Sequence, residues 1–218
     1  MKTIAKPLSA LVLLAGMGLA STAEAALFAR LGGLAVYDQD RNITWLANAN
    51  YAQTSGYDTD GGMTWQTAKT WAEGLNIGGY TGWRLPTTLQ PDATCQSQSG
   101  GDSYGYNCTG SELGHLFYNE LGGAAGSSIG TVHNTNYDLF TNVKSSVYWS
   151  GTEYAPLPFY AWLFSTFIGD QYGDVKDVSY YAWAVRSGDV AAVPEPGVMG
   201  LLGVGALAWA GAKARRRG

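Results

Sequence analysis

The sequence predicts one loop-rich α+β domain between two terminal processing segments. Segments with strand-like alternation occur early and late in the chain, and helical periodicity occurs between them. This order of strands, helices and strands is typical of α+β domains. Only 14 % of the 218 residues are charged, and the chain has 30 Gly, 8 Trp and 14 Tyr. This composition disfavours disorder and favours an aromatic core.

The first half of the domain is expected to contain two strands and a helix. Residues 27–37 and 43–46 read as short strands joined by a polar turn. Residues 48–62 are polar and glycine-rich, which predicts a loop. A helix should follow Thr64, its N-cap, because apolar residues then recur at helical spacing: Trp65, Ala68, Trp71, Ala72 and Leu75.

The second half is expected to supply another helix and an antiparallel meander. Residues 82–87 are expected to form a strand or extended segment that Pro86 ends. The capping-box pattern Thr109-Gly110-Ser111-Glu112 starts the second helix, and residues 126–142 look irregular. Three strands are expected at 147–154, 159–164 and 180–186. We therefore expect two helices against a small, mostly antiparallel sheet.

Residues 1–25 have the three parts of a secretory signal peptide. Lys2 and Lys6 precede an apolar run at residues 8–20, and Ala23-Glu24-Ala25 offers a small-x-small cleavage site. The alternative is an anchored N-terminal helix, but the apolar run is short for a membrane span. We expect export across the inner membrane and a mature domain at residues 26–192.

The C-terminal segment, residues 193–218, combines an extended peptide, an apolar stretch and a basic end. The prolines of Pro194-Glu195-Pro196 exclude regular helix or central strand. Residues 197–212 carry no charge and predict a transmembrane segment, which the basic residues would hold on the cytoplasmic side. The basic cluster consists of Lys213, Arg215, Arg216 and Arg217.

These three parts, in this order, resemble the PEP-CTERM sorting signal of Gram-negative bacteria. The resemblance implies transient anchoring in the inner membrane, recognition by an exosortase and removal of the tail. The product would then be attached to the cell surface or released. A plain C-terminal membrane anchor is the alternative.

Cys95 and Cys108 are expected to form a disulfide. They are the only 2 cysteines and lie in a polar, glycine-rich segment of a chain expected to be exported. Such a loop would contribute about 3 kcal/mol in the chain-entropy model. A zinc site would need more ligands nearby.

The charge balance disfavours acidic partners. Between the processing segments the domain carries 7 basic and 15 acidic residues, a net charge near −8. A surface of this sign matches nucleic acid and anionic lipid poorly. Neutral ligands, cations or proteins are more suitable partners.

Four segments in this order resemble the Lcl C-terminal domain family. They are MTWQTAKTWAEGLNIGGYTGWRLPT, SELGHLFYNELG, YWSGTEY and YAWAVRSGD. The resemblance spans residues 31–189, and its most specific parts are the W-R-L-P-T and W-S-x-T-E blocks. It implies a fold related to C-type lectins and to formylglycine-generating enzymes, in a secreted or surface-bound protein.

Two departures limit what this resemblance implies. Sugar-binding C-type lectins hold calcium through an E-P-N or Q-P-D type motif and a W-N-D motif. Here Gln90-Pro91-Asp92 lies far before the late strands, and W-N-D does not occur. Formylglycine-generating enzymes need reactive cysteines, whereas Cys95 and Cys108 have the setting of a structural pair.

Charged motif residues give the sharpest structural hypothesis. Arg84 and Glu153 each lie near a tryptophan at the expected edge of the core, where a charge needs a partner. We expect them to form an ion pair or to share a hydrogen-bond network. A catalytic role for Glu153 is the alternative.

An acidic loop between two late strands is a candidate ligand site: Asp170, Tyr172, Asp174 and Asp177. These carboxylates could supply oxygen ligands for calcium, but the spacing does not match the twelve-residue calcium loop. Asp58 and Asp60 invite the same interpretation. The expectation is that the chain holds no metal and no other cofactor.

Aromatic residues could also bind sugars. The five tryptophans at 65, 71, 149, 162 and 183 fall on expected core faces. Five tyrosines lie in glycine-rich loops and are better candidates for a ligand surface: Tyr51, Tyr57, Tyr104, Tyr106 and Tyr172. His115 on the second helix and His133 in a polar loop belong to no catalytic motif.

Three functions remain open. The first is a non-enzymatic binding module for a glycan or exopolysaccharide, displayed or released at the cell surface. The second is a structural matrix protein with no discrete ligand site. The third is an extracellular enzyme of the formylglycine-generating type, which would require a free thiolate.

Overall fold

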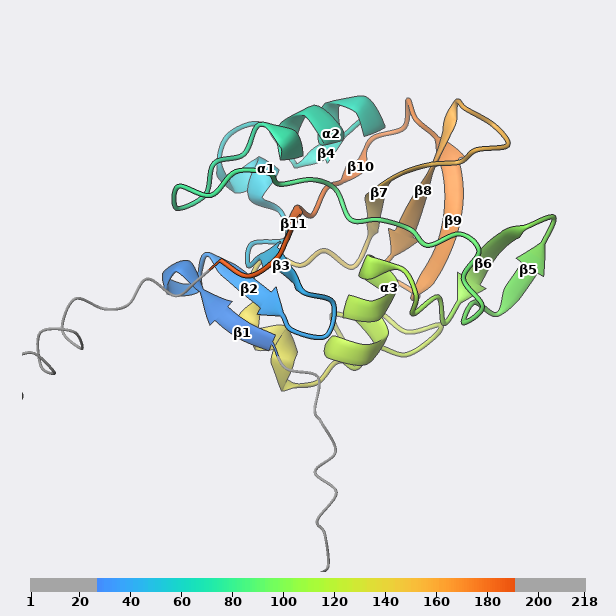
Figure 1. The fold of residues 1–218 in the computed structure, drawn as a ribbon, viewed down its shortest axis with the longest axis horizontal. Helices are drawn as coiled ribbons and strands as arrows, with labels where there is room; N and C mark the ends of the chain where they lie inside the picture. The colour runs from blue at the N-terminus through green and yellow to red at the C-terminus, as the bar shows by residue number, and fades with distance from the viewer. Residues whose placement is uncertain (1–26, 191–218) are drawn as a thin grey trace, which may run out of the picture.

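The computed structural model describes residues 27–190 (Figure 1). The predicted signal peptide at residues 1–25, the sorting signal at 193–218 and its apolar stretch at 197–212 lie outside this range. Within the described range no helix is both long and apolar enough to cross a membrane.

The chain folds into two β-sheets. In the smaller one, strands from the start of the domain pair with a strand from its end. Its four strands are antiparallel, in the order β1-β2-β3-β11. The strands are β1 (Leu27–Arg30), β2 (Ala35–Asp38), β3 (Ile43–Leu46) and β11 (Val185–Ser187).

The first predicted strand is divided by a 3₁₀ turn, η1 (Leu31–Gly33). Leu31, Gly32 and Gly33 all have positive φ, of 52°, 66° and 93°. A strand cannot continue through left-handed backbone, so β1 and β2 become a hairpin.

The larger sheet has seven strands in the order β4-β10-β7-β8-β9-β6-β5. All its pairings are antiparallel except that between β10 and β7. In Figure 1, β7, β8 and β9 lie side by side and the β5–β6 hairpin projects beyond them. The strands are β4 (Gly62–Met63), β5 (Ser97–Ser99), β6 (Asp102–Tyr106), β7 (Val147–Glu153), β8 (Tyr160–Ser165), β9 (Asp170–Val175) and β10 (Tyr180–Tyr181).

The two predicted helices are present. The first is α2 (Trp65–Glu73) with Thr64 at the N-cap position, as expected. The second is α3 (Glu112–His115), which continues into a π-helical turn, η2 (Leu116–Glu120). A one-turn helix α1 (Tyr51–Thr54) and a 3₁₀ turn η3 (Thr135–Leu139) interrupt segments predicted to be irregular.

The capping box predicted at the start of α3 does not form. Ser111 occupies the N-cap position, but its side chain caps no backbone N–H of the helix. Its hydroxyl instead accepts from the N–H of Leu89 at 3.0 Å, and the Glu112 carboxylate is engaged by Arg84. Tertiary contacts have replaced the local cap.

Tryptophans connect the two sheets at the centre of the core. Trp183 packs edge-on against Trp45 of β3, with ring centroids 5.5 Å apart. The Trp183 indole N–H donates to the Leu46 carbonyl at 2.7 Å, and that of Trp149 donates to Met63 at 2.8 Å. The buried indoles of Trp183 and Trp149 thus contribute apolar area with their N–H groups paired, whereas the indole N–H of Trp45 is buried without a partner.

Three parts of the sequence prediction were incomplete. Residues 97–106, expected to be loop, form the β5–β6 hairpin, and residues 170–175, expected to be an acidic loop, form β9. The strand expected at 180–186 is divided, because the chain passes from the larger sheet at β10 to the smaller sheet at β11. The architecture is nevertheless the predicted α+β one.

Candidate ligand-binding site

A pocket lined by aromatic side chains lies where β8 and β9 of the larger sheet face the β5–β6 hairpin. Its volume is about 320 Å³. We call it the aromatic pocket, and its lining residues are Ser99, Asp102, Tyr104, Tyr154, Tyr160, Trp162, Tyr172 and Gly173.

The pocket forms because β6 pairs with β9 along only part of its length. Gly105 and Tyr106 are paired with β9, whereas residues 102–104 of β6 pair with β5. Tyr104 and Asp102 are thus carried on a hairpin that diverges from β9 (Figure 1). The divergence leaves Tyr172 and Gly173 of β9 as one wall of the pocket.

Trp162 is the most enclosed aromatic residue of the pocket, with 3 % of its surface exposed. It is buried, as the sequence predicts, but it is not part of the main hydrophobic cluster, which includes its neighbours Ala161 and Leu163. Its ring meets that of Tyr154 edge-on, with centroids 5.2 Å apart. Gly173, directly opposite Trp162 in the β8–β9 register, adds no side chain over it.

A carboxylate and a phenol give the pocket a polar side. The Tyr154 hydroxyl donates to Asp102 Oδ2 at 2.7 Å, and this hydrogen bond raises the pKa of Tyr154. Burial, followed by the charges of Asp170 and Asp174, raises the pKa of Tyr172. Both phenols therefore stay neutral at physiological pH.

The disulfide holds the hairpin that carries this polar side. Cys95 and Cys108 are bonded, as predicted, and flank β5 and β6. Gln96 N–H also donates to the Tyr106 carbonyl at 2.8 Å next to the bridge. The crosslink therefore closes the base of the hairpin below Asp102 and Tyr104.

The four predicted ligand residues of the acidic segment do not form one site. Asp170, Tyr172 and Asp174 belong to β9, and Asp177 lies exposed in the turn after it. Only Tyr172 lines the aromatic pocket.

The carboxylates of this segment have different surroundings. Asp170 lines a neighbouring hollow of about 460 Å³ with Ser145 and Ser146, and burial raises its pKa. Asp174 accepts from the Tyr180 hydroxyl at 2.7 Å. Within residues 27–190 these acids do not gather into a set of metal ligands.

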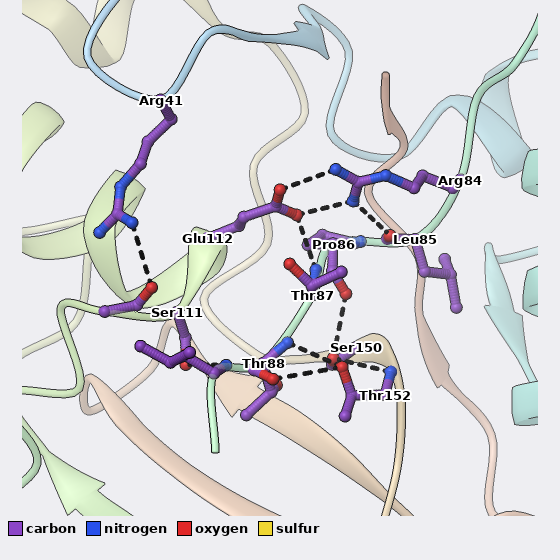
Figure 2. A network of polar contacts seen from close by, with 12 residues as sticks. Arg41, Arg84, Leu85, Pro86, Thr87, Thr88, Ser111, Glu112, Ser150 and Thr152 are labelled. Carbon is purple, nitrogen blue, oxygen red and sulfur yellow. Dashed lines mark hydrogen bonds and ion pairs between the residues drawn. The ribbon is translucent and has the colours of Figure 1, made fainter. Parts of the chain in front are cut away.

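The predicted Arg84–Glu153 pair was wrong, because each residue has a different partner. Arg84 binds Glu112 with two hydrogen bonds of 2.7 Å, whereas Glu153, about half exposed at the end of β7, pairs with Lys176. The helix that supplies Glu112 begins where the R-L-P-T segment passes, so its first carboxylate reaches Arg84 (Figure 2).

The R-L-P-T segment is fixed from both sides (Figure 2). Glu112 also accepts from the Thr87 N–H at 2.6 Å, and the Glu112 N–H donates to the Thr87 carbonyl at 3.1 Å. On the other side, the Ser150 hydroxyl donates to the Pro86 carbonyl at 3.0 Å. The W-R-L-P-T and W-S-x-T-E blocks thus form one structural network, separate from the aromatic pocket.

Sequence reasoning found part of the aromatic pocket. Tyr104 and Tyr172 were among the five tyrosines expected to form a ligand surface. It missed Asp102, which lies in the segment expected to be a loop. It also missed Tyr154, Tyr160 and Trp162, because they lie in expected strands, whose pattern indicates packing rather than a ligand site. The one available signal was the clustering of tyrosines around the cysteine loop and the late strands.

The fold and the pocket define an α+β domain with a preformed, aromatic-lined cavity and one disulfide. Residues 34–186 match the Lcl C-terminal domain family, and residues 192–217 match the PEP-CTERM protein-sorting motif. The first match covers well over half of the chain, so the protein belongs to the Lcl C-terminal domain family. No curated protein matches the chain. The sorting motif marks it as an exported protein that an exosortase processes for the surface or the exterior.

Proposed function

We propose that the domain is a non-enzymatic binding module that holds neutral sugar units of a surface or matrix polysaccharide in the aromatic pocket. The observation that carries this proposal is the convergence of five aromatic rings and one carboxylate on a single open cavity. Aromatic rings present apolar faces on which the C–H face of a sugar ring can stack, while the carboxylate accepts hydrogen bonds from hydroxyls.

The size and charge of the pocket agree with such a ligand. Its volume, about 320 Å³, lies at the lower end of the range for small-molecule sites and suits one or two sugar rings. Asp102 would repel an acidic sugar placed beside it, and the acidic domain as a whole would repel a polyanion. Neutral units are therefore the better occupants.

The processing signals support this proposal, because export to the surface or the exterior would give the module access to polysaccharide. In the proposed sequence of events, the tail anchors the exported chain in the inner membrane only until an exosortase removes it. The domain would then reach the cell surface or the matrix, where a polysaccharide-binding pocket could retain it.

A formylglycine-generating activity is disfavoured by the cysteines. Both are bonded to each other, and the described residues include no free cysteine. A thiolate nucleophile would require that this bond be reduced.

The test is calorimetric binding of the full-length protein, in mild detergent, to the exopolysaccharide of the producing cell. Tyr104→Ala is the informative variant, because this side chain is 41 % exposed and its removal should leave the fold intact. Tyr57→Ala is its matched control, a tyrosine that is 53 % exposed and does not line the pocket. We expect saturable binding that weakens about fivefold or more in Tyr104→Ala only.

Two results would contradict the proposal. One is the absence of saturable binding by the unaltered protein, which would favour the structural-matrix alternative. The other is equal binding by Tyr104→Ala and Tyr57→Ala. Repeating the titration with calcium and with chelator separates a metal-dependent site from the metal-free one proposed here.

A further inference from the structure

A second group of chemically active side chains lies away from the aromatic pocket. Asp38 ends β2, His115 ends α3 and Glu120 ends η2, so three separate elements supply them. One ligand atom from each residue lies within 4.8 Å of the other two. The relative exposures are 1 % for Asp38, 8 % for His115 and 0 % for Glu120.

The two carboxylates are incompletely satisfied. The Nε2 atom of His115 lies 3.0 Å from Glu120 Oε1 and 4.0 Å from Asp38 Oδ2. Asp38 Oδ2 and Glu120 Oε2 are both buried without a hydrogen-bond partner. Burying a carboxylate oxygen without a partner costs free energy. In a fully hydrogen-bonded network this cost is absent, so the present arrangement favours a positively charged ligand.

Arg41 does not neutralise the pair. Its backbone N–H donates to Asp38 Oδ1 at 3.0 Å, but its guanidinium donates to the carbonyls of Thr109 and Gly110. Among residues 27–190, His115 is the only ion-pair partner of either carboxylate. One imidazole offers at most a single positive charge to the two carboxyl groups.

The π-helical turn builds the group. Residues three or four apart are neighbours on an α-helix, whereas His115 and Glu120 are five apart. The bond from Leu121 N–H to the Leu116 carbonyl, 2.9 Å, closes the wider i→i+5 turn. This widening brings the Glu120 carboxylate to the imidazole, and π turns are frequent at functional sites.

We propose that Asp38, His115 and Glu120 bind one divalent transition-metal ion of the Zn²⁺ type. An imidazole nitrogen with two carboxylates suits zinc, whereas calcium takes six to eight oxygen ligands. Zinc bonds of 2.0–2.2 Å place tetrahedral ligands about 3.4 Å apart. The observed spacings of 3.0 and 4.0 Å bracket that value, and all three ligand atoms lie within 4.8 Å of one another, so side-chain shifts would complete the site.

Bound metal would crosslink β2 to the end of α3 and so stabilise the fold. The site is distinct from the aromatic pocket, because the two share no residue. Its failure would therefore leave the polysaccharide proposal untouched. Its success would not support that proposal either.

The test uses the untagged full-length protein in mild detergent, stripped with chelator and titrated with ZnCl₂ alone. We expect one tight Zn²⁺ per chain. At a hundredfold excess over Kd, Tm should rise by about 5–10 °C. CaCl₂ at the same concentration should produce no such rise.

Variants locate the ion. Glu120→Gln is nearly isosteric and removes a buried charge, so its apoprotein should remain folded while its Zn²⁺ affinity falls at least about tenfold. His133→Gln is the control, since that ring is partly exposed and contacts the Ile129 carbonyl and the Tyr137 ring. It should bind Zn²⁺ as the unaltered protein does.

A measurement on the unaltered protein removes dependence on variant folding. The chain has only 2 histidines, so imidazole NMR signals can be assigned with His133→Gln alone. One equivalent of Zn²⁺ should shift the His115 ring signals and leave those of His133 in place. No tight Zn²⁺ uptake, no shift at His115, or unchanged affinity in a folded Glu120→Gln variant would each overturn the proposal.

Discussion

Arg84 and Glu112 form a two-pronged ion pair in which Nη1 and Nη2 each lie 2.7 Å from a different carboxylate oxygen. The pair is partly shielded, with 12 % of the Glu112 side chain and 32 % of the Arg84 side chain exposed. Glu112 also accepts from the Thr87 N–H, and Arg84 also donates to the Leu85 carbonyl. One pair therefore fixes both the start of α3 and the R-L-P-T segment.

Replacing Arg84 by lysine should destabilise the protein by about 1–3 kcal/mol, although the charge is kept. A lysine ammonium cannot reproduce the planar double contact. Glu153→Gln, which breaks the more exposed pair with Lys176, should cost less than about 1 kcal/mol. Urea unfolding of both variants checks the ranking, and equal losses would show that the geometry of the Arg84 pair is unimportant.

The need of Arg84 for an acidic partner could be predicted from the sequence, but the identity of that partner could not. That Arg84 needs a buried carboxylate partner follows from its position beside a tryptophan. Which carboxylate it meets depends on tertiary arrangement, and Glu112 had an adequate local role as part of a capping box. Glu112 could serve the local capping box or the long-range ion pair, and in the structure it forms the ion pair.

The fold was predictable where periodicity was strong and continuous. The strand at Ile43–Leu46 and the helix after Thr64 appear at the expected places. The strand is a short run of β-branched and apolar residues that is buried throughout, and the helix buries the apolar face that its periodicity predicts. The strand β9 was missed because its alternation joins Asp170, Tyr172 and Asp174, residues typical of a loop. The segment forms a strand because it pairs with β8 on one side and β6 on the other, although its composition does not favour a strand.

The candidate sites depend on residues far apart in sequence. Asp102 and Trp162 meet in the aromatic pocket only because β6 and β8 flank β9. Likewise, Asp38 approaches His115 only through the packing of β2 near α3. Contacts between residues so far apart leave no characteristic spacing in the sequence. A single sequence could therefore indicate the tyrosines but not the two sites.

Removing the disulfide should weaken both stability and the aromatic pocket. The double change Cys95→Ala and Cys108→Ala opens a crosslink between residues 13 apart, which should cost about 3 kcal/mol. Polysaccharide binding should fall as well, because the hairpin that carries Asp102 and Tyr104 loses its closed base. Thermal unfolding and calorimetry on the double variant, with the unaltered protein kept oxidised as control, test both parts. Unchanged Tm would show that the hydrogen bonds at the base of the hairpin suffice.

Replacing Gly114 by alanine should destabilise the protein by more than about 2 kcal/mol. In an exposed helix this change would be favourable, but a Cβ on Gly114 would overlap the backbone carbonyl of Cys108. Gly173→Ala is the control, since its added Cβ would lie no closer than 3.6 Å to any neighbour. Urea unfolding should separate the two variants clearly. A Gly114→Ala protein as stable as the control would mean that α3 can move away from the disulfide.

Replacing Asp170 by asparagine should stabilise the protein at neutral pH. Burial raises the pKa of Asp170, and its Oδ1 atom is buried without a hydrogen-bond partner. Between the ordinary aspartate pKa of about 3.9 and the raised value, the folded state binds more protons than the unfolded state. The contribution of Asp170 to stability therefore falls as pH rises through this window. The advantage of Asp170→Asn should accordingly be full above the raised pKa and shrink as the solution is acidified. Urea unfolding at several pH values measures it against Asp177→Asn, which replaces an exposed aspartate in the turn after β9. A pH-independent difference between the Asp170→Asn and unaltered proteins would assign the effect to packing rather than to charge.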